Sequence, residues 1–159
     1  NWVYSPAATI VNGGAPACLV KIPAGQTAIE SSSTLTWKDI TGGHEAAALS
    51  LLGDGKALLS VFFEGNQPFD PSKDDIFDWV FGANWKTFEL DLERRSSSEV
   101  RGLDWHGGGY YTASFDGTDY LLLPGKGYAT TQIYEIDGTE GARLRAHTKG
   151  WATRLFRLR

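Results

Sequence analysis

Two stretches of this chain share one pattern, in which apolar runs flank an Asp-Gly pair. Residues 47–59 contain Asp54-Gly55, and residues 111–123 contain Asp116-Gly117. A two-residue hairpin loop needs positive φ, which aspartate tolerates and glycine adopts without steric cost. The pattern therefore predicts two β-hairpins and favours an antiparallel β-protein.

Further strand-like segments follow each predicted hairpin, so that residues 44–159 repeat one layout. Residues 85–92 and 99–103 follow the first hairpin, and residues 130–136 and 142–147 follow the second. Four antiparallel strands in succession are typical of a propeller blade. We therefore predict an all-β fold of antiparallel four-stranded blades of a β-propeller, about three in number by this layout. A closed β-barrel or β-sandwich is the alternative.

The length of 159 residues suits a single all-β domain or a fragment of a larger one. We expect a partial blade over residues 1–43, a blade over 44–104 and a C-terminal blade over 105–159. The second blade carries a long insertion, residues 65–84, which could open one helical turn near Pro71. Other strands are expected at residues 8–11, 17–22, 27–36 and 151–158.

Charge and hydropathy exclude two classes of partner. The net charge is −4, which argues against a nucleic-acid footprint. No apolar run approaches the roughly 20 residues that span a bilayer as a helix.

The chain starts at Asn1 and contains no Met, so we expect a chain processed from a longer precursor. Cys18, the sole cysteine, lies in an apolar run and is expected to be a buried, inert thiol.

The insertion is rich in carboxylates. Four of them lie close together, at Asp70, Asp74, Asp75 and Asp78. They could supply part of the roughly six to eight oxygens that Ca²⁺ takes, which makes calcium the candidate cofactor. The spacing is not that of an EF-hand. The alternative is a solvated acidic loop whose aspartates cap a turn or helix.

Three histidines, His44, His106 and His147, are candidate metal ligands if the strand ends that carry them converge. None belongs to a ligand-spaced pair. His106 is the strongest candidate because it precedes the glycine run 107–109. The alternative is a turn histidine that hydrogen-bonds the backbone.

Aromatic side chains in loops are the candidates for ligand binding. Trp79 and Trp105 lie in predicted loops, where they could stack on a sugar or a catecholate, although packing in the core is the ordinary role of tryptophan. No nucleophile motif, P-loop or Cys-x-x-Cys is present, so no catalytic residue is predicted. The predicted ligand-binding residues are Trp79, Trp105, His106 and Tyr128.

The last third of the chain carries a family resemblance. Residues 115–124 read Phe-Asp-Gly-Thr-Asp-Tyr-Leu-Leu-Leu-Pro, and residues 128–136 and 150–159 continue the pattern. These segments resemble the C-terminal part of propeller-like bacterial envelope proteins, the myxochelin-cluster lipoprotein family. The resemblance covers residues 54–159 and rests on scaffold motifs. It implies a propeller fold, an envelope location and the absence of the N-terminal blades.

We therefore expect a non-enzymatic binding protein that is secreted, periplasmic or associated with the cell envelope. The resemblance adds the idea of a small ligand such as an iron chelate. The alternatives are a metal-dependent hydrolase, with the three histidines and the acidic loop as ligands, and a structural subunit of an extracellular assembly. Since three blades do not close a ring, we also expect a partner, either a companion fragment of the same precursor or further copies in a homo-oligomer.

Overall fold

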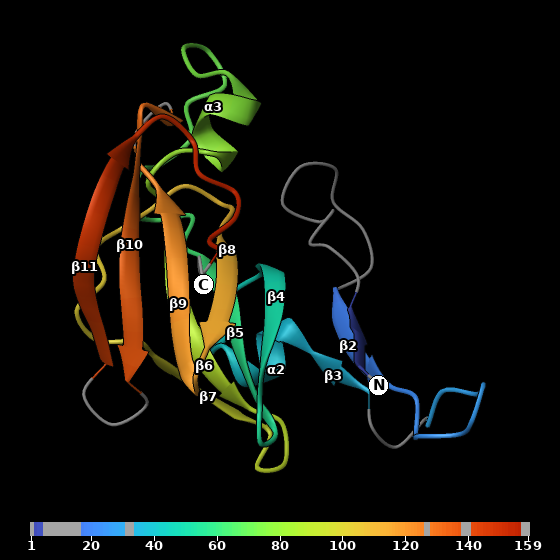
Figure 1. The fold of residues 1–159 in the computed structure, drawn as a ribbon. Coiled ribbons are helices and arrows are strands. Elements are labelled where there is room, and N and C mark those ends of the chain that lie inside the picture. Colours follow the sequence, from blue (N-terminus) through green and yellow to red (C-terminus); the bar gives the residue numbers. More distant parts are fainter. Residues whose placement is uncertain (1, 5–16, 31–33, 126–127, 138–140, 157–159) are drawn as a thin grey trace.

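The computed structural model describes residues 2–4, 17–30, 34–125, 128–137 and 141–156, which form a mostly β architecture (Figure 1). Three antiparallel sheets make up the fold. The N-terminal sheet contains β1 (Trp2–Tyr4), β2 (Cys18–Lys21) and β3 (Leu35–Thr36). The central sheet contains β4 (Ala46–Gly53), β5 (Lys56–Phe62), β6 (Trp85–Asp91) and β7 (Ser96–Glu99). The C-terminal sheet contains β8 (Tyr111–Phe115), β9 (Thr118–Pro124), β10 (Thr130–Asp137) and β11 (Gly141–Lys149).

The central and C-terminal sheets have the repeated layout that the sequence predicts. Each is a meander in which consecutive strands are neighbours, in the orders β4-β5-β6-β7 and β8-β9-β10-β11. Both Asp-Gly hairpins are present with the expected backbone. Asp54 and Gly55 have φ of 48° and 72°, and Asp116 and Gly117 have φ of 51° and 77°. The described strands do not join into one closed sheet.

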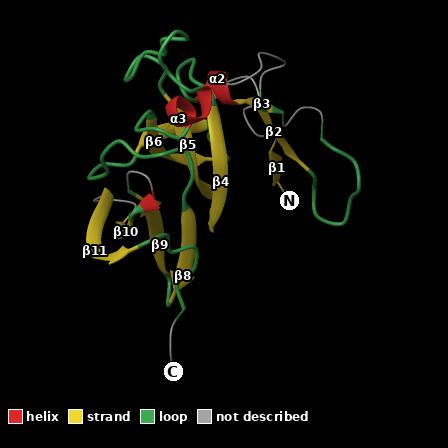
Figure 2. Ribbon diagram, turned by 90° about the horizontal axis from the view of Figure 1, so that it is seen from above, coloured by secondary structure: helices red, strands yellow, loops and turns green. Residues whose placement is uncertain are grey.

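Strand β5 is buried on both faces because the central sheet lies between the other two (Figures 1 and 2). Successive side chains of a strand point to opposite faces. Leu59 and Val61 face the core shared with the N-terminal sheet, where Trp37 is fully buried. Leu58 faces the opposite way, into the core shared with Leu121 of the C-terminal sheet. Each face of β5 thus supports a separate hydrophobic core.

Two short helices complete the fold. The helix α3 (Ile76–Val80) is the helical turn expected in the insertion, and Asp75 caps its N-terminus. The helix α2 (Trp37–Ile40) was not predicted. It begins after Thr36, whose hydroxyl accepts a hydrogen bond from the Asp39 N–H at 3.3 Å. Neither helix has the length and apolar character needed to cross a bilayer, and the described residues contain no other candidate.

The N-terminal segment agrees only in part with the strands expected there. In residues 27–36 the described strand covers only Leu35–Thr36, and the strand expected at residues 8–11 lies outside the described residues. Cys18 is half-buried rather than buried, because it stands at the start of the short strand β2.

The expected strand at residues 151–158 is wrong for the part that the structure describes. Residues 151–156 pair with no strand and instead cross the outer face of the C-terminal sheet. The Thr131 hydroxyl anchors this segment, since it donates to the Gly150 carbonyl at 2.9 Å and accepts from the Ala152 N–H at 2.8 Å. The Trp151 ring then packs 4.8 Å from Tyr128. The apolar residues here therefore belong to a covering segment.

Candidate functional site

A pocket of about 600 Å³ opens where the central and C-terminal sheets meet. It lies at the end of these sheets beside which α3 stands (Figure 1). Three parts of the chain line it: the β5–β6 insertion, the connection from β7 to β8, and the adjoining ends of β9 and β10. Because the two sheets are joined through a packed core below this point, the pocket has a fixed floor.

Aromatic side chains form much of the pocket wall. Phe81, Trp105 and Tyr128 line it and remain 52%, 38% and 38% exposed. Two of these rings, those of Trp105 and Tyr128, pack against other aromatic rings. Trp105 packs edge-to-face against Phe63 at 5.5 Å, and Tyr128 packs against Trp151 at 4.8 Å. Large aromatic rings that are both supported and exposed are suited to stacking on a ligand.

Two carboxylates, Asp78 and Asp104, supply the charge of the pocket. Neither receives a hydrogen bond or forms an ion pair within the described residues. Burial raises the pKa of the Tyr134 hydroxyl, and the nearby charge of Asp104 raises it further. That hydroxyl donates to the amide oxygen of Gln132, another lining residue, at 3.3 Å. The polar part of the lining therefore carries negative charge on two exposed carboxylates.

His106 is a structural residue of this site. Its backbone forms a β-bridge with Trp85, with N···O distances of 3.0 and 3.2 Å. Its Nδ1 lies 2.5 Å from the Gly107 carbonyl, which can only accept, so Nδ1 carries the proton. In the neutral ring Nε2 then accepts from the Thr87 hydroxyl at 3.1 Å. Burial lowers the pKa of His106 to about 4, although the Gly107 carbonyl acts in the opposite direction. Both ring nitrogens are therefore occupied by protein partners.

The glycine run that follows His106 permits a close approach to the insertion. A Cβ on Gly108 would lie 2.8 Å from the Trp85 indole, and one on Gly107 would lie 2.9 Å from the Phe81 carbonyl. Gly109 has no neighbour within 4 Å of such a Cβ. Two of the three glycines thus serve packing, and the run is not simply a flexible linker.

Trp79 anchors the insertion and does not line the pocket. Its indole N–H donates to the Gln67 carbonyl at 2.5 Å. Its ring packs between Phe62 at 5.0 Å and Phe69 at 5.1 Å. Trp79 is a predicted ligand-binding residue because the sequence places it in a loop. In the structure it lies in α3 and belongs to an aromatic core of the insertion.

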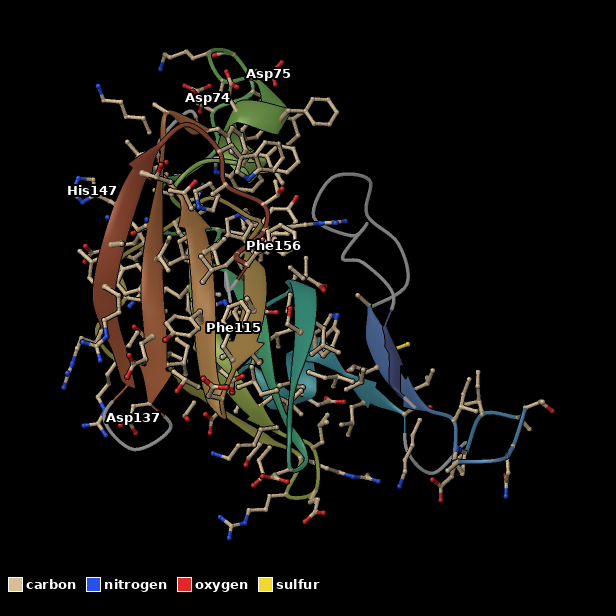
Figure 3. The ribbon with its side chains drawn as sticks, in the orientation of Figure 1. Asp74, Asp75, Phe115, Asp137, His147 and Phe156 are labelled. Atoms are coloured by element: carbon tan, nitrogen blue, oxygen red, sulfur yellow. The ribbon has the colours of Figure 1, made fainter. Side chains whose placement is uncertain are left out.

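The acidic loop uses its carboxylates to hold its own backbone. Asp70 accepts from the Ser72 N–H at 3.0 Å and from Lys73 at 2.6 Å, and these contacts lower its pKa, with the Lys73 bond as the largest cause. Asp74 accepts from the Asp70 N–H at 2.8 Å. Asp75 caps α3 by accepting from the Phe77 N–H at 2.8 Å. Asp74 and Asp75 lie at the tip of the insertion (Figure 3).

No metal centre forms from the candidate ligands. Within the described ranges, no three His, Cys, Asp or Glu side chains lie close enough together to hold an ion. The His44 ring stacks 4.0 Å from Phe63, whereas His147 projects from the outer strand β11 (Figure 3). The calcium site and the three-histidine site suggested by the sequence thus lack a ligand cluster in this part of the chain.

The structure brings together three of the four predicted ligand-binding residues, Trp105, His106 and Tyr128, at one pocket. Sequence reasoning missed Phe81, Asp104 and Gln132 as lining residues. Asp104 adjoins Trp105 in the sequence, which is a weak signal. Nothing in the sequence shows that Phe81 or Gln132 faces the same space, because their proximity depends on how the two sheets pack.

Comparisons with protein-family models and with curated sequences find no relative of this chain. No protein-family model matches the chain, and no curated protein sequence matches it. The geometry of the pocket is therefore the basis for the proposed function.

We predict that Gly108→Ala destabilises the protein and that Gly109→Ala does not. The added methyl on residue 108 would overlap the fully packed Trp85 indole, at a cost of about 1–3 kcal/mol in the free energy of unfolding. The methyl on residue 109 enters open space and should change this free energy by less than about 0.5 kcal/mol. Urea unfolding of both variants measures the difference. Equal stabilities would contradict the close approach to Trp85.

We predict that burial of His106 makes stability fall in mild acid. Its folded pKa of about 4 lies below the value of 6.5 for a free histidine, so the unfolded chain takes up the proton first as the pH drops. The contribution of His106 is complete above about pH 7 and falls from pH 6.5 toward pH 4, by about 3 kcal/mol in total.

Urea unfolding across this pH range tests the effect. His106→Gln should remove this part of the pH dependence, whatever its effect on stability at pH 7.5. The control His147→Gln, at an exposed position on β11, should keep it. A His106→Gln profile parallel to that of the unaltered protein would show that His106 is not buried in its neutral form.

Proposed function

We propose that this protein is a non-enzymatic binding protein that holds a small ligand in the pocket between its central and C-terminal sheets. The observation that carries the proposal is the convergence of three exposed aromatic rings, two of them supported by ring packing, and two carboxylates without a partner among the described residues. Ligand pockets typically combine apolar and aromatic walls with a few polar groups that fix orientation. The volume of about 600 Å³ is in the range of such sites.

The chemistry of the lining supports binding rather than catalysis. The described lining residues include no serine, threonine, cysteine or lysine that could act as a nucleophile. His106, the conventional base, has both ring nitrogens engaged, and burial lowers its pKa to about 4, which makes it a weak base. A metal-dependent hydrolase has no ligand cluster among these residues to build on.

We further propose that the central and C-terminal sheets are consecutive blades of a β-propeller, in a secreted or envelope-associated protein. Three observations support this arrangement: the repeated meander, the equivalent Asp-Gly hairpins and the face-to-face packing, in which the Tyr110 hydroxyl of one unit donates to the Ala48 carbonyl of the other at 2.6 Å. A companion fragment or a further copy would then cover the exposed Leu144, Trp151 and Phe156, which the mass of the native species would reveal.

We predict that small molecules bind at this pocket and nowhere else on the described surface. NMR titration with three probes, choline, maltose and a ferric catecholate complex, should shift the Trp105 indole resonance for at least one of them. Trp105→Leu and Tyr128→Leu should each weaken that binding by about tenfold, because each removes a stacking ring worth about 1 kcal/mol or more.

The matched control is Phe77→Ala, which removes an exposed aromatic ring of α3 that does not line the pocket. It should leave the affinity unchanged. The binding function would be refuted if no probe shifted the pocket resonances, or if all three variants weakened binding equally.

A further inference from the structure

We infer that the ligand of this pocket is an organic cation, whose ammonium group lies among the aromatic rings and faces Asp78 and Asp104. The inference rests on the proposed binding function and adds the chemical class of the ligand. It goes against the anionic iron chelate that the family resemblance suggests.

The first support is the unpaired negative charge. Several other carboxylates of the two sheets have cationic partners, among them Glu89 with Lys56 at 2.6 Å and Glu135 with Arg145 at 2.6 Å. Asp78 and Asp104 have none among the described residues, although they come from different segments and line the same pocket. A cation that entered the pocket would supply the missing partner for both.

The second support is the lack of positive charge on the described lining. No lysine or arginine is among those residues, and His106 stays neutral down to about pH 4. The ammonium group of Lys86 lies nearby, but it is already committed to Glu99, at 2.5 Å. The lining residues that the structure describes thus carry two negative charges and no positive one to balance them.

The third support is the aromatic wall. A cation over the face of an aromatic ring, within about 6 Å of its centre, is attracted by the negative π-face. Trp105 already shows this contact, with the Lys86 ammonium 4.7 Å from the ring centre. Phe81 and Tyr128 offer two further exposed rings. Rings and carboxylates at one site together favour a cation over a neutral ligand.

The same features oppose an anionic chelate. A ferric catecholate complex carries net negative charge, so binding would bring it against Asp78 and Asp104. Like charges at close range repel each other. The aromatic rings would not offset this, because their faces are also negative.

The test compares choline with 3,3-dimethyl-1-butanol, which has the same shape but carbon in place of the charged nitrogen. Choline is smaller than the pocket and serves as a probe of its charged end. We expect choline to bind at least about tenfold more tightly than the neutral alcohol. Asp104→Asn and Asp78→Asn should each weaken choline binding by about fivefold and leave binding of the alcohol unchanged.

The control Glu93→Gln removes an equal charge at the opposite end of the central sheet and should have no effect on choline binding.

The outcomes separate this inference from the proposed function. Equal affinities for choline and the alcohol, or tighter binding of the ferric catecholate, would overturn the cation assignment and leave the binding function standing. Failure of every probe, whatever its charge, would overturn both. Loss of choline affinity in Glu93→Gln to the same extent as in Asp104→Asn would also contradict the inference, because the effect would then come from overall charge.

Discussion

The burial of β5 on both faces is the constraint on which the rest of the structure depends. Leu58, Leu59 and Val61 are all fully buried, yet they belong to two different hydrophobic cores. A strand of an isolated sheet needs one covered face, whereas this strand needs two. The N-terminal sheet covers one side and the C-terminal sheet covers the other. This layering fixes the spacing of the sheets and explains why β5 reads as a continuous apolar run, Ala-Leu-Leu-Ser-Val-Phe, with one serine.

The pocket follows from the same layering. Below it, Leu58, Leu121 and Tyr134 fill the space between the central and C-terminal sheets. At the end of β5, Phe62 turns to a different set of partners, Val80 and Trp85, which belong to the insertion and its junction with β6. The insertion therefore stands beside the sheets and not between them. The space left open between the sheets is the pocket, and aromatic and acidic side chains line it.

The sequence could predict the elements that local chemistry determines. The Asp-Gly turns need positive φ, so both hairpins and the four-stranded repeat were predictable, as was the helical turn of the insertion. Features set by tertiary packing could not be predicted from the sequence. Trp79 and Trp105 both lie in predicted loops, but only packing decides that Trp79 is an anchor and Trp105 a pocket wall. Likewise, the apolar residues after Gly150 fit a strand or a covering segment, and the Thr131 hydroxyl decides for the latter.

Unfolding of variants with one shortened β5 side chain tests the two-sided burial most directly. Leu58→Ala and Leu59→Ala remove the same atoms from opposite faces, so each should lower the free energy of unfolding by about 2–5 kcal/mol. The exposed Leu51→Ala on β4, 55% accessible, should change it by less than about 0.5 kcal/mol. A large loss for only one of the β5 variants would contradict the account, because it would mean that one of the two neighbouring sheets does not cover β5.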